Sequence, residues 1–333
     1  MKILLITESK NDYLADCILH GLREHIGENL IDFPRKNSMY TNHSKDLKKT
    51  HGLGFTLYGL LPNIPIERRG LLKKIQQNYF DFVIFSSISR QFDKYEELYH
   101  FLNPSKTIFV DGDDTFKYFS DRTQFIKKNW NKNTKGLFAE SKYFKREVTR
   151  KSYYKFPFWG PFFVLNLFFT KTKRKFHNIS FSIPEEKIVT TVPKKTKDFP
   201  MHIVDKEIAN TLKLSDKRYV FETEKAYYND LQSSKFGITT KRAGWDCMRH
   251  YEIAANGAVI CFKDLVKKPK NCAPYGLIPG VNCLNYSNWN DLKNQISMLN
   301  EDQYIKIQYE SIKWARFNST KNFAKRFIEQ LEE

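Results

Sequence analysis

The 333-residue sequence lacks several patterns that would assign a protein to a class at once. It has no uninterrupted run of about 18 apolar residues, so we expect no membrane-spanning helix. Its five cysteines show no C-x-x-C spacing, which argues against a zinc site or a disulfide framework and favours a reducing compartment. No G-x-G-x-x-G segment is present, so the dinucleotide-binding fingerprint is missing. Residues 1–7 pass directly into polar residues, and we expect a core strand there rather than a secretion signal.

Acidic residues are scarce relative to basic ones. The 37 Asp and Glu residues face 55 Lys and Arg residues, which gives a formal net charge of +18. This surplus favours anionic partners, and nucleoside diphosphates, acidic glycans, membrane surfaces and nucleic acids all qualify. Hydrophobic residues make up 41% of the chain, enough for a packed core, and the length suffices for two ordinary domains. The charge alone does not choose among these partners.

The most informative stretch is 235–262, whose pattern predicts a strand, a polar loop, a short helix and a second strand. The first strand is expected at Lys235–Thr240, and the apolar run 258–262 is typical of a buried parallel strand. Met248–Ala255 fits a helix that Asn256–Gly257 ends. A loop and a helix N-terminus between parallel strands attract anions, because backbone N–H groups point there.

Two charged side chains of this helix suggest which anion. Arg249 and Glu252 are three positions apart and therefore share one helix face. A guanidinium suits a phosphate, and a carboxylate accepts hydrogen bonds from ribose hydroxyls. The pattern indicates a site for a nucleoside diphosphate. The alternative is that Arg249 and Glu252 form a solvated pair on the surface of an ordinary α/β protein.

Three segments resemble the donor-binding half of GT-B glycosyltransferases of the family 1 and 4 type: Arg249–Ala258, Gly276–Tyr286 and Trp289–Leu299. The resemblance covers roughly the last hundred residues. It implies an α/β fold with two Rossmann-like domains that face each other across a cleft. Retaining members carry a second glutamate eight positions before the helical one, where this chain has Gly244. Whether transfer inverts or retains the anomeric centre therefore stays open.

The resemblance also implies a division of the chain. Residues 1–184 are expected to form an acceptor-side Rossmann-like domain, and residues 185–312 a nucleotide-sugar-binding one. A strand at Lys187–Val192 would open the second domain. Residues 313–333 form the last helix, which is expected to cross back onto the first domain.

Five residues form the donor site that the resemblance implies. Arg242 and Arg249, with the backbone after Gly244, would neutralise the diphosphate without a metal. Glu252 would hold the ribose. Trp245 would stack on the base or close the sugar pocket, and it is equally suited to a core position. The expected co-substrate is a UDP- or GDP-sugar, with no further cofactor.

Three carboxylates follow the apolar run Lys106–Val110: Asp111, Asp113 and Asp114. Carboxylates placed together at a strand end need counter-charges, a metal or a catalytic task. Asp111 and Asp113 form a D-x-D pattern, which holds a metal in GT-A glycosyltransferases. The separate donor segment favours another role, in which one of the three takes the proton of an acceptor hydroxyl. Turn and capping chemistry is the alternative.

Loops that follow strands supply further candidates. Glu8 and Asp12 follow the first strand and would contact the acceptor, although Asp12 is equally suited to cap a helix. Ser141 would cap a helix that carries Lys145 and Arg146, either as a solvated basic face or towards the donor phosphates.

Residues 153–175 are dense in aromatic side chains and flanked by Lys and Arg. Pro157, Gly160 and Pro161 interrupt the apolar run, which suits an interfacial anchor on an anionic membrane surface rather than a span. A core segment and a base-stacking surface for nucleic acid are the alternatives.

These observations lead to one functional hypothesis with two rivals. The first is a metal-independent glycosyltransferase of polysaccharide biosynthesis, cytoplasmic or peripheral on the inner membrane face. It would transfer sugar from a nucleotide sugar to a glycan or a lipid-linked saccharide. The second is a sugar transferase acting on modified DNA bases, or another nucleic-acid-binding protein. The third is a non-catalytic carbohydrate-binding protein of GT-B-like fold.

Overall fold

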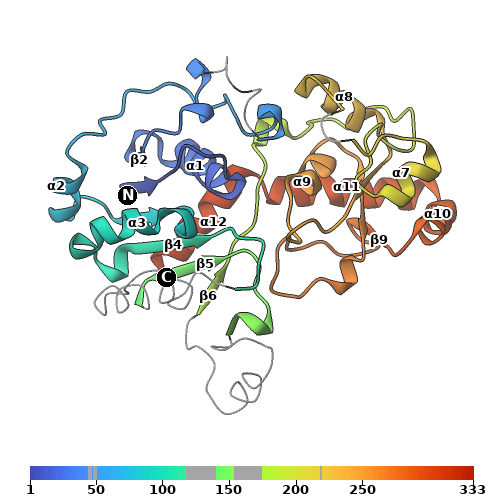
Figure 1. Cartoon of the computed structure of the whole chain (residues 1–333). Helices are drawn as coiled ribbons and strands as arrows, with labels where there is room; N and C mark the ends of the chain where they lie inside the picture. The colour runs from blue at the N-terminus through green and yellow to red at the C-terminus, as the bar shows by residue number, and fades with distance from the viewer. Residues whose placement is uncertain (44–46, 48–50, 118–139, 154–174, 218–219) are drawn as a thin grey trace, which may run out of the picture.

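Two parallel β-sheets lie side by side in the computed structural model (Figure 1). The structure describes residues 1–43, 47, 51–117, 140–153, 175–217 and 220–333. The first sheet has six strands in the order β2-β1-β3-β4-β5-β6, and the second has three in the order β7-β8-β9. The strands of the first sheet are β1 (Ile3–Ile6), β2 (Leu30–Phe33), β3 (Phe82–Phe85), β4 (Thr107–Asp111), β5 (Lys142–Lys145) and β6 (Phe176–Asn178). Those of the second sheet are β7 (Phe236–Thr239), β8 (Val259–Lys263) and β9 (Cys283–Tyr286).

Helices cover these sheets, which is why the short strands consist mostly of buried apolar residues. The helices of the first half are α1 (Tyr13–Ile26), α2 (Leu71–Gln76) and α3 (Ile88–Leu98). Those of the second half are α7 (Lys206–Leu212), α8 (Glu224–Ser233), α9 (Met248–Ala255), α10 (Trp289–Met298) and α11 (Glu301–Phe317). The last helix, α12 (Thr320–Glu332), lies beside α1 in the first half (Figure 1). No helix in the described ranges is both long enough and apolar enough to cross a bilayer.

Two expected elements are wrong. Lys142–Lys145 forms strand β5 and not the helix expected after Ser141. The reason is that Tyr143 and Phe144 are both fully buried, on opposite faces of the sheet, against Phe176 and against Phe327 of α12.

The second correction concerns the start of the second half. A short 3₁₀ helix forms at Glu185–Lys187, and residues 188–192 join neither sheet. The Val189 N–H instead donates to the Ala255 carbonyl at 2.9 Å, a single bond in place of a strand ladder. Of the aromatic stretch 153–175, residues 154–174 lie outside the described residues.

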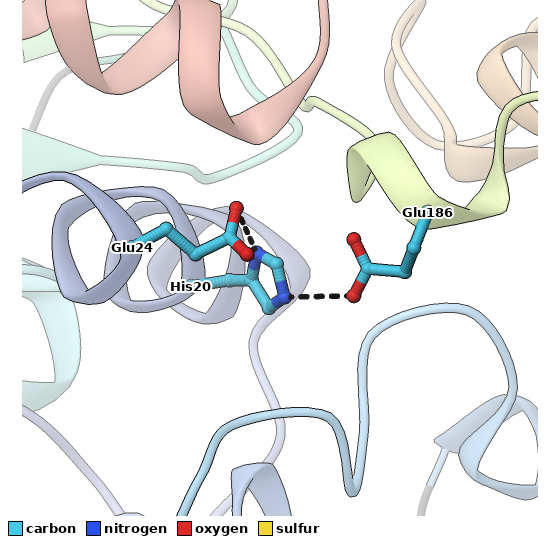
Figure 2. Close-up of side chains that lie close together, drawn as sticks. All are labelled: His20, Glu24 and Glu186. Atoms are coloured by element: carbon cyan, nitrogen blue, oxygen red, sulfur yellow. Dashed lines mark ion pairs between the residues drawn. The ribbon is translucent and has the colours of Figure 1, made fainter.

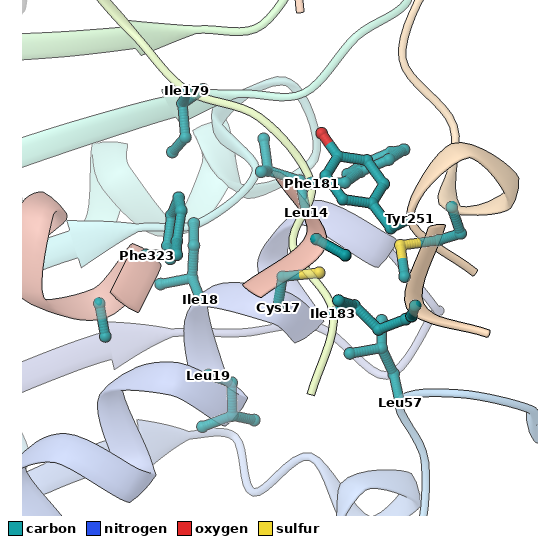
Figure 3. Close-up of a cluster of buried hydrophobic side chains, with 14 of the residues drawn as sticks. Leu14, Cys17, Ile18, Leu19, Leu57, Ile179, Phe181, Ile183, Tyr251 and Phe323 are labelled. Atoms are coloured by element: carbon teal, nitrogen blue, oxygen red, sulfur yellow. The ribbon is translucent and has the colours of Figure 1, made fainter. Parts of the chain in front are cut away.

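One buried apolar cluster joins the two halves. It contains Cys17 of α1, Leu57, Ile183, Tyr251 of α9 and Phe323 of α12, which meet in Figure 3. Segments from both halves therefore share a core. The two sheets are consequently held in one arrangement by apolar packing as well as by the chain crossings.

The chain crosses between the halves twice, and the two crossings are hydrogen-bonded to each other. The Ile183 N–H donates to the Asn318 carbonyl at 3.1 Å, and the Thr320 N–H donates to the Ile183 carbonyl at 2.8 Å. This pairing places the first turn of α12 directly against α1.

A buried histidine lies at this crossing (Figure 2). The imidazole of His20 on α1 is 1% exposed, with Nε2 3.5 Å from Glu186 Oε1 and Nδ1 3.8 Å from Glu24 Oε2. Nδ1 also lies 2.9 Å from the hydroxyl of Thr320. His20, Glu24 and Glu186 are close enough together to bind a metal ion. The two carboxylates, however, face different nitrogens of the ring and not one common point. The contacts of the imidazole with Glu186 and Thr320 tie α1 to both crossings.

Gly21 permits the close contact between α1 and α12. A Cβ atom at this position would lie 2.2 Å from the Thr320 carbonyl oxygen and 3.1 Å from Ala324 Cβ. We expect Gly21→Ala to lower the free energy of unfolding by about 1–3 kcal/mol. In a helix position without such a contact, a Gly→Ala change raises the free energy of unfolding by up to about 1 kcal/mol. Urea unfolding measures the change, and a stabilised variant would contradict this packing.

Candidate functional site

A cavity of about 550 Å³ lies between the two halves. This is the size of cavity that takes a nucleotide-sized ligand. The second half contributes the end of β7, the loop that follows it and the start of α9. Both halves contribute aromatic and charged side chains, among them Tyr13, Phe55, Asp114, Arg146, Phe181, His202, Asp216, Phe221, Tyr227, Arg242, Arg249 and Glu252.

Two guanidinium groups give one wall of the cavity its positive charge. Arg242 precedes α9 and Arg249 lies in its first turn, and both line the cavity. Neither forms an ion pair with a carboxylate in the described part of the chain, whereas Arg146 pairs with Asp114. Guanidinium groups without such ion pairs, next to a helix N-terminus, make this wall suited to an anion.

His202 fixes the orientation of one of these arginines. Arg249 Nη2 donates to Nδ1 of His202 across 2.9 Å. Burial, followed by the charges of Arg249 and Arg242, lowers the pKa of His202 to about 4. The imidazole is therefore neutral at pH 7, and its Nδ1 can act as the acceptor that this contact requires.

Glu252 is the carboxylate of the same wall, and both its oxygens accept hydrogen bonds. Oε2 accepts from the hydroxyl of Tyr227 at 2.7 Å. Oε1 accepts from the hydroxyl of Thr56 at 2.5 Å, so a residue of the first half reaches α9. The carboxylate is thereby held in one orientation while it still lines the cavity.

Residues of the first half also hold the loop before α9. The Glu147 carboxylate accepts from the Trp245 N–H at 2.7 Å, and Arg146 Nη1 donates to the Asp246 carbonyl at 2.8 Å. A Cβ atom at Gly244 would lie 2.6 Å from both Asp114 Oδ1 and Glu147 Oε1. Glycine at this position, where the resembled retaining enzymes have glutamate, leaves room for carboxylates that come from the other half.

Trp245 lies outside the cavity wall. Its ring packs beside Phe262 at a centroid distance of 6.2 Å, and Lys241 Nζ lies 5.6 Å from the ring centroid. The stacking role expected for this residue therefore has no geometric support in this conformation, and Phe55, Phe221 and Tyr227 are the aromatic side chains that line the cavity.

The three aspartates after β4 have different environments. Asp111 is 1% exposed, forms a 3.0 Å ion pair with Lys145, accepts from the hydroxyl of Tyr143 and does not line the cavity. Asp113 accepts a hydrogen bond from Ser89 and does not line the cavity. Asp114 lines the cavity and pairs with Arg146.

The two acceptor candidates of the first loop also lie outside the cavity wall. Asp12 caps α1 by accepting from the N–H groups of Leu14 and Ala15, and its carboxylate lies 3.4 Å from Arg90. Burial raises the pKa of Glu8 above its ordinary value, an effect that Arg90 opposes. Their contact with an acceptor stays a prediction.

Several cavity residues gave no signal in the sequence. Phe55 comes from a segment that was expected as a loop, and His202 stands alone without a motif. Arg146 was expected either on a solvated basic face or towards the donor phosphates, and the structure places it in the cavity lining. Its contact with Asp246 joins residues 100 positions apart and has no local signal.

A second buried histidine next to the cavity gives the protein a pH-dependent stability. His250 is fully buried, its Nε2–H donates to the Trp245 carbonyl at 2.9 Å, and the hydroxyl of Thr239 lies 3.0 Å from its Nδ1. Burial is the main cause that lowers its pKa from 6.5 to about 4. Between pH 6.5 and pH 4, His250 is therefore protonated in the unfolded chain but neutral in the folded chain. The free energy of unfolding falls as the pH drops from 6.5 towards 4.

The variant His250→Gln isolates this contribution, because glutamine keeps a donor for the Trp245 carbonyl but does not titrate. We expect wild type to have the larger free energy of unfolding at pH 7. The difference between the two proteins should shrink by about 2 kcal/mol as the pH falls to 4.5. Urea unfolding at several pH values measures this difference in free energy of unfolding. A difference that does not depend on pH would contradict the conclusion that folding lowers the pKa of His250.

Comparison with known proteins identifies the fold. No protein-family model matches the chain, and no curated protein sequence matches it. The solved structure of Anabaena Alr3699/HepE with UDP aligns over 100% of both chains, with a TM-score of 0.55 and 10% sequence identity. The same protein with UDP-glucose aligns over 100% of this chain and 99% of that one, at TM-score 0.52 and 10% identity. A glycosyltransferase from Rickettsia africae ESF-5 aligns over 99% and 97%, at TM-score 0.53 and 13% identity. The chain has the GT-B fold of these structures, as its sequence predicts.

Proposed function

We propose that the protein transfers a sugar from a nucleoside-diphosphate sugar to a hydroxyl group of a glycan or a lipid-linked saccharide. One observation carries the proposal: the cavity between the halves presents two guanidinium groups without ion pairs to described carboxylates, beside a fixed carboxylate. The residues are Arg242, Arg249 and Glu252. That set matches a diphosphate and a ribose in adjacent positions. The GT-B fold and its UDP-bound neighbours support the same assignment.

In this proposal the second half binds the donor. Arg242 and Arg249 neutralise the diphosphate, which gains negative charge as its bond to the sugar breaks. Glu252 accepts hydrogen bonds from the ribose hydroxyls. The aromatic end of the cavity, with Phe221 and Tyr227, would enclose the base. UDP is the first nucleotide to test because of the Anabaena structures, with GDP second.

The first half presents the acceptor. Its hydroxyl oxygen forms a bond to the anomeric carbon as the bond from that carbon to the phosphate oxygen breaks. Asp114 takes the hydroxyl proton, and Arg146 holds that carboxylate at the cavity wall. The nucleoside diphosphate leaves.

A thermal-shift panel of nucleoside diphosphates and sugar nucleotides tests the proposal. At a ligand concentration about 100 times Kd, binding adds about 2.7 kcal/mol to the stability of the folded chain. We expect UDP or GDP to raise the melting temperature of wild type and to have little effect on Glu252→Ala. The proposal fails if no compound of the panel stabilises wild type.

A further inference from the structure

One residue of the cavity network has a backbone conformation that its side chain disfavours. Thr56 has φ +75°, and the Leu57 N–H donates to the Phe55 carbonyl at 2.9 Å, which closes a γ-turn around it. A β-branched residue rarely adopts a positive φ, because its side chain crowds the backbone. Gly52 and Gly54 nearby also have a positive φ, as glycine favours, and Leu53 between them has φ +58°.

The side chain of Thr56 explains why threonine occupies this turn. Its hydroxyl donates to Glu252 Oε1 at 2.5 Å and accepts from the hydroxyl of Tyr228 at 2.9 Å. Its N–H donates to Glu224 Oε1 at 2.5 Å, and Lys187 pairs with the other oxygen of Glu224 at 2.7 Å. Glu252, Tyr228 and Glu224 all belong to the second half, and Lys187 lies in the segment that leads into it. Thr56 itself is 1% exposed.

The direction of each hydrogen bond follows from these contacts. Because the Tyr228 hydroxyl donates to Thr56, the Thr56 proton is directed to Glu252. Tyr227 likewise directs its proton to the second carboxylate oxygen, at 2.7 Å. Two fixed donors, one on each oxygen, set the plane of the Glu252 carboxylate. A carboxylate has about four acceptor positions, so two stay available for a ligand.

The two remaining acceptor positions suit a vicinal diol. Glu252 is partly buried and lines the cavity, so its carboxylate can contact a ligand there. The 2′- and 3′-hydroxyls of a ribose are adjacent donors that a fixed carboxylate can accept together. A freely rotating carboxylate would have to be ordered during binding, at a cost in affinity.

We propose that Thr56 is a positioning residue of the donor site, supplied by the opposite half: it fixes the Glu252 carboxylate to accept both ribose hydroxyls. This inference rests on the proposed function. It makes the ribose subsite composite, so that ribose recognition requires the segment around Thr56 to lie against α8 and α9. Backbone strain at this turn is retained because glycine would lack the hydroxyl.

The test compares ligands with and without ribose hydroxyls. Isothermal titration calorimetry measures the Kd of UDP and of 2′,3′-dideoxy-UDP for the full chain, with the GDP pair used instead if GDP binds more tightly. We expect Thr56→Val to weaken UDP binding about tenfold and to leave dideoxy-UDP binding unchanged. Thr56→Ser keeps the hydroxyl and should bind UDP like wild type.

Two further variants separate positioning from folding. Thr56→Gly removes the hydroxyl and relieves the backbone strain, so it should fold at least as stably as Thr56→Val and show the same loss for UDP. In a Glu252→Gln background, Thr56→Val should change UDP affinity little further, since both changes act on one contact. The inference is overturned if Thr56→Val weakens the binding of UDP and dideoxy-UDP equally, or if neither Thr56→Val nor Thr56→Gly weakens UDP binding. Either result leaves the proposed function standing. Absence of any nucleotide binding to wild type removes both.

Discussion

Replacing Asp114 with asparagine lowers kcat by about 10²–10⁴-fold while the Kd of the nucleotide sugar stays nearly unchanged. Asparagine keeps the shape of the side chain and can still accept the hydrogen bond from Arg146. It has no basic carboxylate to take the proton of an acceptor hydroxyl. Only the step that forms the new glycosidic bond should suffer. Steady-state kinetics with a saturating donor, together with calorimetric donor binding, measure the two quantities separately.

Asp113 provides the matched control. It stands next to Asp114 in the chain but accepts a hydrogen bond from Ser89 and does not line the cavity. Asp113→Asn should therefore retain most of the wild-type kcat. Equal losses in the two variants would show that the proton acceptor lies elsewhere. Asp111 is unsuitable as a control, because its loss would leave Lys145 buried without a counter-charge.

Replacing Arg249 with methionine raises the Kd of the nucleoside diphosphate by about 10²–10³-fold, which is the usual cost of removing a charge that contacts a buried phosphate. Methionine keeps an apolar stem and removes the guanidinium, which His202 orients and whose carbon lies 5.8 Å from the Tyr227 ring centroid. The loss should be specific for phosphate, so the affinity for the uncharged nucleoside stays close to that of wild type. Calorimetry with UDP and with uridine measures both values.

Arg69 is the control for general charge effects, because its side chain is 92% exposed and its ion-pair partner, Glu67, is two positions away in the chain. Arg69→Met changes the net charge by the same amount and should leave both affinities unchanged. If Arg249→Met binds UDP as well as wild type, the diphosphate does not lie at the start of α9.

The sequence predicts the region around α9 well because its signals are local. The helix expected at Met248–Ala255 has those bounds in the structure, since an amphipathic run ends at an Asn-Gly pair. The flanking strands β7 and β8 lie within one or two residues of their expected ranges. Arg249 and Glu252 therefore come to one wall of the cavity, as their spacing requires.

What the sequence does not predict depends on distant partners. Strand β5 was expected as a helix, because nothing local shows that Phe327 would cover Phe144. Thr56 reaches Glu252 across 196 positions of the chain, and no periodic pattern reports such a contact. For the same reason the three neighbouring aspartates looked equivalent, and only their tertiary environments separate the buried Asp111 from the cavity-lining Asp114.

The most direct measurement is a crystal structure of the full chain with bound UDP, or with GDP if the thermal-shift panel selects it. The expected result places the diphosphate between the guanidinium groups of Arg242 and Arg249, and the two ribose hydroxyls on the Glu252 carboxylate. A nucleotide bound away from this cavity, or one whose phosphates face neither arginine, would contradict the donor site.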